Sequence, residues 1–311
     1  MRIGAHVSIE GGLSRAVERA VAIGAECLQM FVSPPQSWRP PSHGAEAVAE
    51  FKASRRAADV WPLFLHTVYL LNLASAKASL RASSLESLVA YLEWGENLEA
   101  DGVITHLGSA RDMGPAEAEA AIVEALGRAL EAARGDVPLL METTAGPGKV
   151  FGSTFQELGA VLNRLGRPVR LRVCLDTAHV YASGLYDGTA GGLERMLASF
   201  EAEIGLDRLT AIHLNDSKSA FGSRVDRHAN VGEGRLGVRG LRPFFQHPAL
   251  QNLPFILEVP GREKRGADKR NVEAAWALTE AQEDETGEPE PDDPSAAGGP
   301  FRRRWLSSLR P

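Results

Sequence analysis

Two hydrophobic patterns alternate along this chain from its first residues to about residue 282. Short runs rich in β-branched and apolar residues predict strands, and longer segments with apolar positions three and four apart predict helices. Strands are predicted at 2–7, 26–32, 62–66, 102–107, 138–142, 170–176, 209–215 and 254–259. Helices are predicted at 13–23, 45–58, 79–99, 115–134, 154–165, 192–204, 241–247 and 271–282. Eight alternating units predict a (β/α)8 TIM barrel, although an open doubly wound sheet alternates in the same way.

The pattern ends near residue 283, where the composition changes. The segment EDETGEPEPDDPSAAGGP is acidic and proline-rich and contains no large apolar side chain. Such a composition cannot bury enough apolar surface to offset chain entropy, so disorder is predicted for 283–311. The basic end, FRRRWLSSLRP, is interpreted either as a solvated tail or as a short docking motif. The sequence thus predicts one catalytic barrel at 1–282, followed by a tail.

Composition and charge place few limits on function. The 311 residues are 44% hydrophobic and 24% charged, which is ordinary for a globular protein. No apolar run approaches the about 20 residues that cross a bilayer, and the first residues lack the apolar core of a signal peptide, so a cytoplasmic protein is expected. The net charge is −6, of which −4 falls between Glu280 and Pro311. Charge does not exclude a nucleic-acid partner, because bound cations would add positive charge to the barrel.

Polar side chains fall at the ends of six consecutive predicted strands. These strand-end residues are His66, His106, Glu142, Asp176, His213 and Glu258. The carboxyl ends of the strands form the active-site face of a (β/α)8 barrel, so all six are expected in one bowl. Taken singly, a strand-end His is usually a hydrogen-bonded structural residue, and an Asp or Glu usually caps the next helix. Six in register indicate divalent cations, because buried carboxylates repel one another without them.

Three further candidate ligands lie close to these residues in the sequence. His179 follows Asp176 by one helical turn, and Asp226 and His228 form an Asp-x-His pair whose side chains point to one side of an extended backbone. Nine imidazole and carboxylate ligands suit zinc or manganese and fit two or three ions; the absence of thiolate ligands argues against a structural zinc site. His6, at the end of the first strand, is expected to orient a ligand through a hydrogen bond.

Five segments of the chain carry a family resemblance. They read IGAHVS at 3–8, HTVYLLNLAS at 66–75, ETTAGPG at 142–148, LDTAHVYASG at 175–184 and HLNDSKSAFGSRVDRHANVGEG at 213–234. In content and order they resemble endonuclease IV, over residues 1 to about 280. The resemblance implies the same TIM barrel and three divalent ions, usually zinc, with manganese as the alternative at one or more sites.

The resemblance also implies a role for each candidate ligand. His66 and His106 hold the first ion, and Glu142 bridges it to the second. The second site is completed by Asp176, His213 and Glu258. The third ion is held by His179, Asp226 and His228. Glu142 and Glu258 are the two residues that the resemblance places closest to catalysis.

The implied activity is that of a metal-dependent endodeoxyribonuclease of base excision repair. A hydroxide between the first two ions attacks the phosphodiester 5′ to an abasic site, the third ion neutralises the leaving oxygen, and a 3′-hydroxyl remains. The implied partner is double-stranded DNA with abasic or 3′-blocked lesions, bound by a monomer at the nucleoid. The predicted DNA contacts are Gln36, Trp38, Arg39, Tyr69, Leu70, Lys218, Arg224 and Arg227.

Each group of DNA contacts also has a structural interpretation. Tyr69 and Leu70 resemble a wedge that kinks DNA by entering between base steps, although both could instead pack beneath their loop. The basic residues after the seventh strand suit phosphate contacts or a solvated loop. The chain departs from the family at Gln36, where well-studied members place an arginine, and at Leu107, where a proline often follows the fourth-strand histidine.

Two functions are alternatives to the nuclease. A metal-dependent sugar isomerase or epimerase also collects His, Asp and Glu at the strand ends of such a barrel. Enzymes of that kind use one or two ions and have no need of a third set such as Asp226 and His228. A metal-loaded protein that binds DNA lesions without cutting them would need a blocked water site, which nothing in the sequence indicates.

Overall fold

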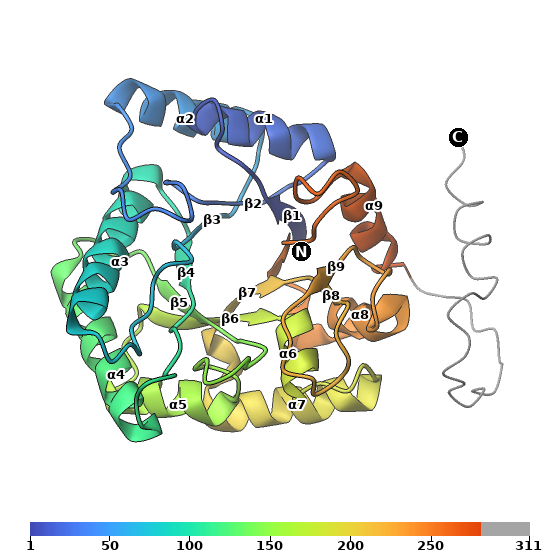
Figure 1. Cartoon of the computed structure of the whole chain (residues 1–311). Helices are drawn as coiled ribbons and strands as arrows, with labels where there is room; N and C mark the ends of the chain where they lie inside the picture. Colours follow the sequence, from blue (N-terminus) through green and yellow to red (C-terminus); the bar gives the residue numbers. More distant parts are fainter. Residues whose placement is uncertain (281–311) are drawn as a thin grey trace. The chain divides into compact units, whose positions relative to one another are not determined.

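Eight parallel strands close into a barrel in the part of the chain that the computed structural model describes, residues 1–280 (Figure 1). The strands are β1 (Arg2–His6), β2 (Leu28–Met30), β3 (Leu63–His66), β4 (Gly102–Thr105), β5 (Leu139–Glu142), β6 (Leu171–Asp176), β7 (Leu209–His213) and β10 (Pro254–Leu257). Neighbours in sequence pair in parallel, and β10 closes the barrel against β1, with Arg2 opposite Pro254. The predicted (β/α)8 barrel is confirmed, and the predicted tail at 283–311 lies outside the described residues.

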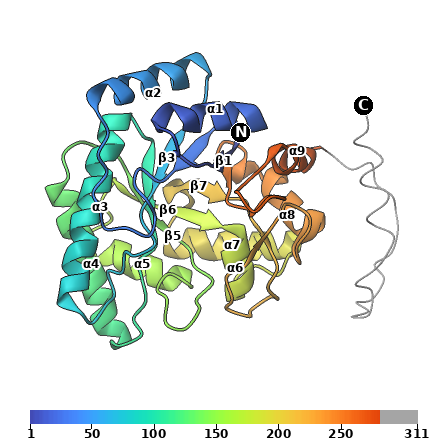
Figure 2. The same ribbon diagram turned by 45° about the horizontal axis from the view of Figure 1, so that its top comes forward.

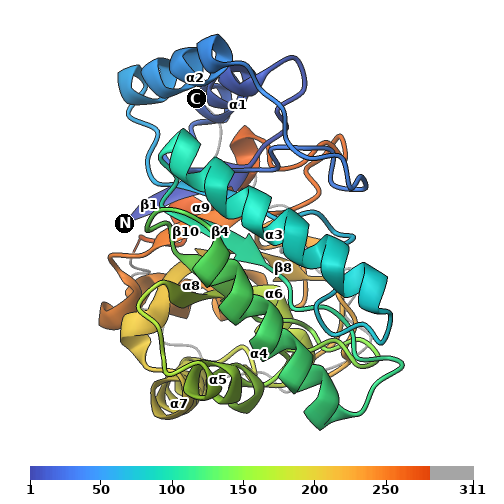
Figure 3. The same cartoon turned by 90° about the vertical axis from the view of Figure 1, so that its left-hand side faces the viewer.

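Helices form a ring around the strands (Figure 1, Figure 2). They are α1 (Leu13–Ile23), α2 (Ala45–Ala57), α3 (Ala78–Leu98), α4 (Pro115–Ala132), α5 (Phe155–Arg164), α6 (Thr177–Ser183), α7 (Ala190–Glu203), α8 (Gly237–Gln246) and α9 (Lys269–Ala277). Two 3₁₀ turns, η1 (Leu206–Arg208) and η2 (Pro248–Leu250), precede β7 and β10. The long helices α3 and α4 pack side by side on one flank (Figure 3). None of the described helices is both long and apolar enough to span a bilayer.

Local sequence explains where several helices begin and end. Thr154 starts α5 through a capping box, in which its side chain accepts from the Glu157 N–H and Glu157 accepts from the Thr154 N–H. Gly24 ends α1 in the left-handed conformation that glycine adopts without a steric penalty. The predicted helix at 241–247 begins earlier, at Gly237, and the one predicted at 271–282 ends at Ala277. The short helix α6 was not predicted as a helix.

The barrel encloses a small apolar layer that is separate from the core between strands and helices. Its residues are Cys27, Phe64, Ile104, Leu140, Cys174, Ala211 and Ile256. On β1 the corresponding position is Gly4, where a Cβ would collide with the carbonyl group of Cys27, so β1 and β2 approach closely only because no side chain intervenes. Side chains two residues further along each strand point to the same side. The apolar layer therefore forms the floor beneath the side chains at the carboxyl ends of the strands.

A small antiparallel sheet, which the sequence pattern did not predict, follows β7. It pairs β8 (Asp216–Ser217) with β9 (His228–Ala229). The buried Asp216 carboxylate accepts hydrogen bonds from the backbone N–H groups of Ser217, Gly234, Leu236 and Gly237. One carboxylate thus ties the start of this excursion to the turn that leads into α8. The excursion carries the candidate ligands Asp226 and His228.

Candidate metal centre

A ring of polar side chains lies directly above the apolar floor of the barrel. Each member is two residues beyond a floor position, so all eight strands contribute one side chain to the ring. The ring consists of His6, Gln29, His66, His106, Glu142, Asp176, His213 and Glu258. Sequence reasoning singled out seven of these positions and missed Gln29. The signal for it was present: Gln29 stands two residues after Cys27 in a buried strand, the same spacing that separates Ile104 from His106.

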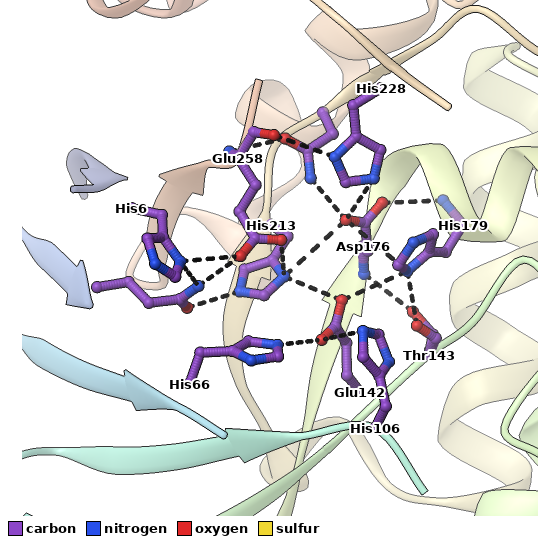
Figure 4. A network of polar contacts seen from close by, with 12 residues as sticks. His6, His66, His106, Glu142, Thr143, Asp176, His179, His213, His228 and Glu258 are labelled. Carbon is purple, nitrogen blue, oxygen red and sulfur yellow. Dashed lines mark hydrogen bonds and ion pairs between the residues drawn. The ribbon is translucent and has the colours of Figure 1, made fainter. Parts of the chain in front are cut away.

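The candidate ligands gather into three overlapping groups (Figure 4). Within each group, the ligand atoms lie within 4.8 Å of one another. The first group is His66, His106 and Glu142; the second is Glu142, Asp176, His213 and Glu258; the third is Asp176, His179 and His228. The structure therefore brings together eight of the nine residues that the sequence suggested, and it places Asp176 in two groups.

Asp226, the ninth residue, lies beside the third group. Its Oδ2 is 3.2 Å from His179 Nε2, and its Oδ1 is 3.2 Å from His228 Nε2. Neither ring nitrogen has a hydrogen-bond partner despite being buried. Two imidazole nitrogens and a carboxylate that face one another without hydrogen bonding are the arrangement expected of ligands around a shared cation.

Glu142 divides its two oxygens between neighbouring groups. Oε2 lies 3.1 Å from His66 Nε2 and 3.4 Å from His106 Nε2. Oε1 lies 3.1 Å from His213 Nδ1 and 3.4 Å from His179 Nδ1. A fully buried carboxylate placed in this way can serve two cations at once, one through each oxygen.

The Asp176 carboxylate has both roles that are open to a carboxylate at a strand end: it caps a helix and it faces the candidate ligand groups. Its Oδ1 accepts from the His179 N–H at 2.8 Å and caps α6. Its Oδ2 accepts from the Asn215 side-chain amide at 2.6 Å and lies 3.7 Å from His228 Nε2. Asn215 was not predicted to take part. The capping bond and the amide fix the carboxylate so that one oxygen faces the second and third groups.

Backbone carbonyls determine which nitrogen of three histidines is free. Nδ1 of His66 donates to the Thr67 carbonyl at 2.8 Å, and Nδ1 of His179 donates to the Thr143 carbonyl at 2.8 Å. Nδ1 of His228 donates to the Glu258 carbonyl at 3.1 Å. Because a carbonyl only accepts, each Nδ1 carries a proton, so in the neutral form of the ring it is Nε2 that presents its lone pair to the ligand groups. This partnership is the usual way in which proteins orient metal-ligating histidines.

The charges of the cluster are compensated only by histidine among the described residues. No lysine or arginine there pairs with the carboxylates of Glu142, Asp176, Asp226 or Glu258. Burial raises the pKa of Glu142, but His106 and His213 outweigh it and hold the pKa well below its ordinary value. Burial lowers the pKa of His228, but Asp176 and Asp226 outweigh it and raise the pKa to about 9. In the metal-free protein, the positive charge beside these carboxylates therefore comes from protonated histidines. Divalent cations suit that role better.

A cavity of about 790 Å³ opens onto the cluster. His6, His66, His106, His179 and Glu258 lie on its floor. The walls come from the loops after β1, β2, β3, β8 and β10, and they include the basic residues Arg227 and Arg265. Of the predicted DNA contacts, Tyr69 and Arg227 line this cavity.

The other predicted DNA contacts lie outside the cavity lining. Gln36, Trp38 and Arg39 are exposed on the loop after β2, and Lys218 and Arg224 are exposed on the excursion between β8 and β9. Leu70 is half-buried and packs against the core.

Tyr69 is exposed at the rim of the cavity. Its side chain is 62% exposed, and its ring meets the edge of Phe31 at 5.1 Å between centroids. The Tyr69 N–H donates to the Pro35 carbonyl, which joins the loops after β2 and β3. The Tyr69 ring therefore packs against Phe31 and is otherwise largely open to solvent.

The chain is similar over most of its length to a group of known proteins. A family model described as a xylose isomerase-like TIM barrel matches residues 17–281. A protein of Halothermothrix orenii named probable endonuclease 4 is 38% identical over 267 residues, which cover 85% of this chain and 96% of that protein. The structure of endonuclease IV from Thermus thermophilus superposes with a TM-score of 0.77 at 36% identity, covering 89% of this chain and 98% of that one. D-psicose 3-epimerase from Clostridium cellulolyticum shares the fold alone, with a TM-score of 0.63 at 15% identity over 89% of this chain and 96% of that one.

Proposed function

Because the chain belongs to the endonuclease IV family, we propose that it is a metal-dependent endodeoxyribonuclease of base excision repair. It hydrolyses the phosphodiester on the 5′ side of an abasic site and leaves a 3′-hydroxyl. Its substrate is double-stranded DNA with abasic or 3′-blocked lesions. The observation that carries this proposal is the overlap of three ligand groups through the shared carboxylates Glu142 and Asp176.

Nine residues would hold three divalent ions, zinc or manganese, in this proposal. His66, His106 and Glu142 hold the first; Asp176, His213 and Glu258 join Glu142 at the second; His179, Asp226 and His228 hold the third. When bound, such ions supply a hydroxide nucleophile near neutral pH and neutralise charge on phosphoryl oxygens. Glu142 keeps the first two sites at a fixed spacing through its two oxygens. Glu258 lies at the cavity side of the second site, where a phosphate would enter.

The cavity walls supply the proposed contacts to DNA. Arg227 lines the cavity next to the third group and would bind a phosphate oxygen, with Lys218 and Arg224 further out on the same excursion. Tyr69 would enter the base stack beside the lesion, where unstacking is least costly because a base is missing. Gln36, Trp38 and Arg39 extend this surface along the loop after β2, and Leu70 supports Tyr69 from the core side.

The proposal is tested by a nicking assay. The substrate is a labelled duplex with a single abasic analogue, and the matched control is the same duplex with an intact base. The zinc-loaded protein is expected to cut only the abasic duplex, at the 5′ side, and a polymerase should extend the product because it carries a 3′-hydroxyl. Chelated protein should cut neither duplex. Absence of cutting by protein with full metal content would refute the proposed activity.

The same preparation separates the nuclease from a sugar epimerase. An epimerase of this fold would convert ketoses, and it would retain its activity without the third ligand group. Asp226 and His228 favour the nuclease. The Asp226 carboxylate contacts both His179 and His228, and this creates a group that one- or two-ion chemistry does not need. Epimerisation of a ketose by protein that does not cut abasic DNA would select the alternative.

A further inference from the structure

Gln29 is the member of the polar ring that β2 contributes, and it has no exposed surface. Its Oε1 lies 2.8 Å from His213 Nε2. Its Nε2 lies 2.6 Å from Glu258 Oε1 and 2.9 Å from His6 Nδ1. Of the polar residues in the ring, it is the only one with a neutral side chain that both donates and accepts without titrating. Neither the sequence motifs nor the three ligand groups gave it a role.

The contacts of Gln29 determine the direction in which its amide points. A carboxylate only accepts hydrogen bonds, so the amide NH₂ must face Glu258. The amide oxygen then faces His213, and a carbonyl oxygen only accepts. His213 must therefore carry a proton on Nε2. The second N–H of the amide is directed at His6 Nδ1, which accepts it.

This arrangement has one consequence for each partner. With its Nε2 bound to Gln29, His213 presents Nδ1 to the second ligand group, 3.1 Å from Glu142 Oε1 and 3.1 Å from Glu258 Oε2. With its Oε1 held by the Gln29 amide, Glu258 presents Oε2 to the same point. The other oriented histidines of the cluster use backbone carbonyls for this purpose, whereas His213 uses a side chain.

We propose that Gln29 is a positioning residue of the second ion site: it fixes His213 as the Nε2–H tautomer and holds Glu258 by Oε1, so that Nδ1 and Oε2 converge on one cation. The inference rests on the proposed metal centre. It adds a residue that does not itself touch the ion. Removing the Gln29 amide should therefore weaken ion binding at the second site and leave the other two sites unchanged.

The test compares Gln29→Met with the wild-type protein. Methionine has nearly the same length and flexibility, so it fills the space while removing every hydrogen bond. Zinc-loaded proteins are titrated with a competing chelator, and the ions retained are counted. In Gln29→Met one ion should be released at a chelator activity about 10–100-fold lower than in the wild type, because outer partners of metal ligands contribute about that factor. The remaining ions should be released as in the wild type.

A second readout identifies the site that has changed. In the ¹⁵N-histidine-labelled wild type, the buried His213 Nε2–H should give a slowly exchanging resonance. It should disappear in Gln29→Met. It should persist in Gln29→Glu, which keeps an oxygen facing His213. The Glu variant also preserves the shape of the side chain, so it remains informative if the Met variant does not fold.

The matched control is Ile104→Val, which removes one methylene from the apolar floor and leaves every polar contact of the ring intact. It should release all ions as the wild type does. Unchanged ion release in Gln29→Met, or a His213 resonance that survives in it, would show that Gln29 only fills space. Failure of the proposed nuclease is a separate result, because both readouts are made without DNA. Wild-type protein that binds no ion at all would refute the metal centre and the role of Gln29 together.

Discussion

Single residues of the candidate metal centre each use one atom for the scaffold and another for the site. Asp176 caps α6 with Oδ1 and faces the ligand groups with Oδ2. His179 donates from Nδ1 to a carbonyl and leaves Nε2 free. Glu258 is held through Oε1 and presents Oε2. Such division orients the ligand atoms before any cation arrives, which reduces the reorganisation that binding requires.

Glu142 is the residue where substitution should be most damaging. In Glu142→Gln, an amide nitrogen replaces one of the oxygens that face the first two groups, and it cannot serve a cation. We expect turnover on abasic DNA to fall by more than the about 10–100-fold typical of outer partners, with DNA binding nearly unchanged. Steady-state nicking and a filter-binding assay measure the two effects. Glu124→Gln, on the exposed face of α4, is the control. A variant that retains a tenth of wild-type turnover would show that Glu142 does not bridge two ions.

Tyr69 should contribute to lesion selection without contributing to metal binding. Its exposed ring stands at the cavity rim, 6.2 Å from the His66 ring between centroids, and makes no polar contact with the ligands. Stacking of an aromatic ring on a base contributes roughly 1–3 kcal/mol, so Tyr69→Ala should reduce the preference for abasic over intact duplex by about five- to 150-fold. Competition binding measures the preference, and elemental analysis measures the metal content.

Tyr69→Phe is the matched control, because it keeps the ring and removes only the hydroxyl. It should select abasic DNA nearly as well as the wild type. Equal discrimination by Tyr69→Ala at full metal loading would mean that the wedge lies elsewhere on the rim, at Trp38 or Arg39 on the loop after β2.

Strands, helices and connections differed in how well the sequence predicted them. The eight barrel strands were predicted because each is buried on both faces and reads as an apolar run. The six strand-end candidate ligands could be predicted to lie together, because a barrel places all such ends on one face. The strands β8 and β9 have two residues each, which is too short for any periodicity to be detected. Gln29 was not predicted as a site residue, because a neutral amide in a buried strand gives no charge signal. Only its position two residues after Cys27 indicates that it belongs to the ring.

Asp216 should stabilise the whole β8–β9 excursion. Its carboxylate is the shared acceptor for buried backbone N–H groups at both ends of the excursion. Asp216→Ala leaves those donors without an acceptor, and each such loss costs about 1–3 kcal/mol. We expect the free energy of unfolding to fall by at least about 2 kcal/mol and the protein to lose the ion of the third group.

Urea unfolding and elemental analysis measure these two effects of Asp216→Ala. The exposed Asp136, for which no side-chain hydrogen bond is found within the described residues, provides the control variant Asp136→Ala. An Asp216→Ala protein with wild-type stability and three ions would show that the excursion is held by other contacts.

Across the molecule, the cluster couples folding to cations and to protons. Four carboxylates converge in a barrel whose described residues offer them no lysine or arginine partner. The fold therefore depends on positive charge that the sequence does not supply in permanent form. In the metal-free protein this charge comes from protonated histidines, whereas divalent ions supply it in the loaded protein.

Because protons and divalent ions supply the same positive charge, pH should affect the stability of the metal-free and the metal-loaded protein differently. Burial lowers the pKa values of His179 and His228, but neighbouring carboxylates outweigh burial and raise both above the ordinary value of 6.5. A group whose pKa is raised in the folded state stabilises the protein fully below its unfolded pKa, and that stabilisation is lost as pH rises through the folded pKa. For the metal-free protein the loss should run from about pH 6.5 to beyond 9, the pKa of His228 being about 9.

The difference in stability between zinc-loaded and metal-free protein should therefore widen as pH rises from 6.5 to 9. For His228 alone, the metal-free form should lose on the order of 3 kcal/mol over that interval, since one pKa unit corresponds to about 1.4 kcal/mol. The loaded form should lose less, because its ions need no protons to remain in place and bind better as the histidines become neutral. Chemical unfolding of both forms at several pH values, with stoichiometric zinc in the loaded samples, measures the difference. A constant or narrowing difference would mean that protons do not compensate the carboxylates of the metal-free protein.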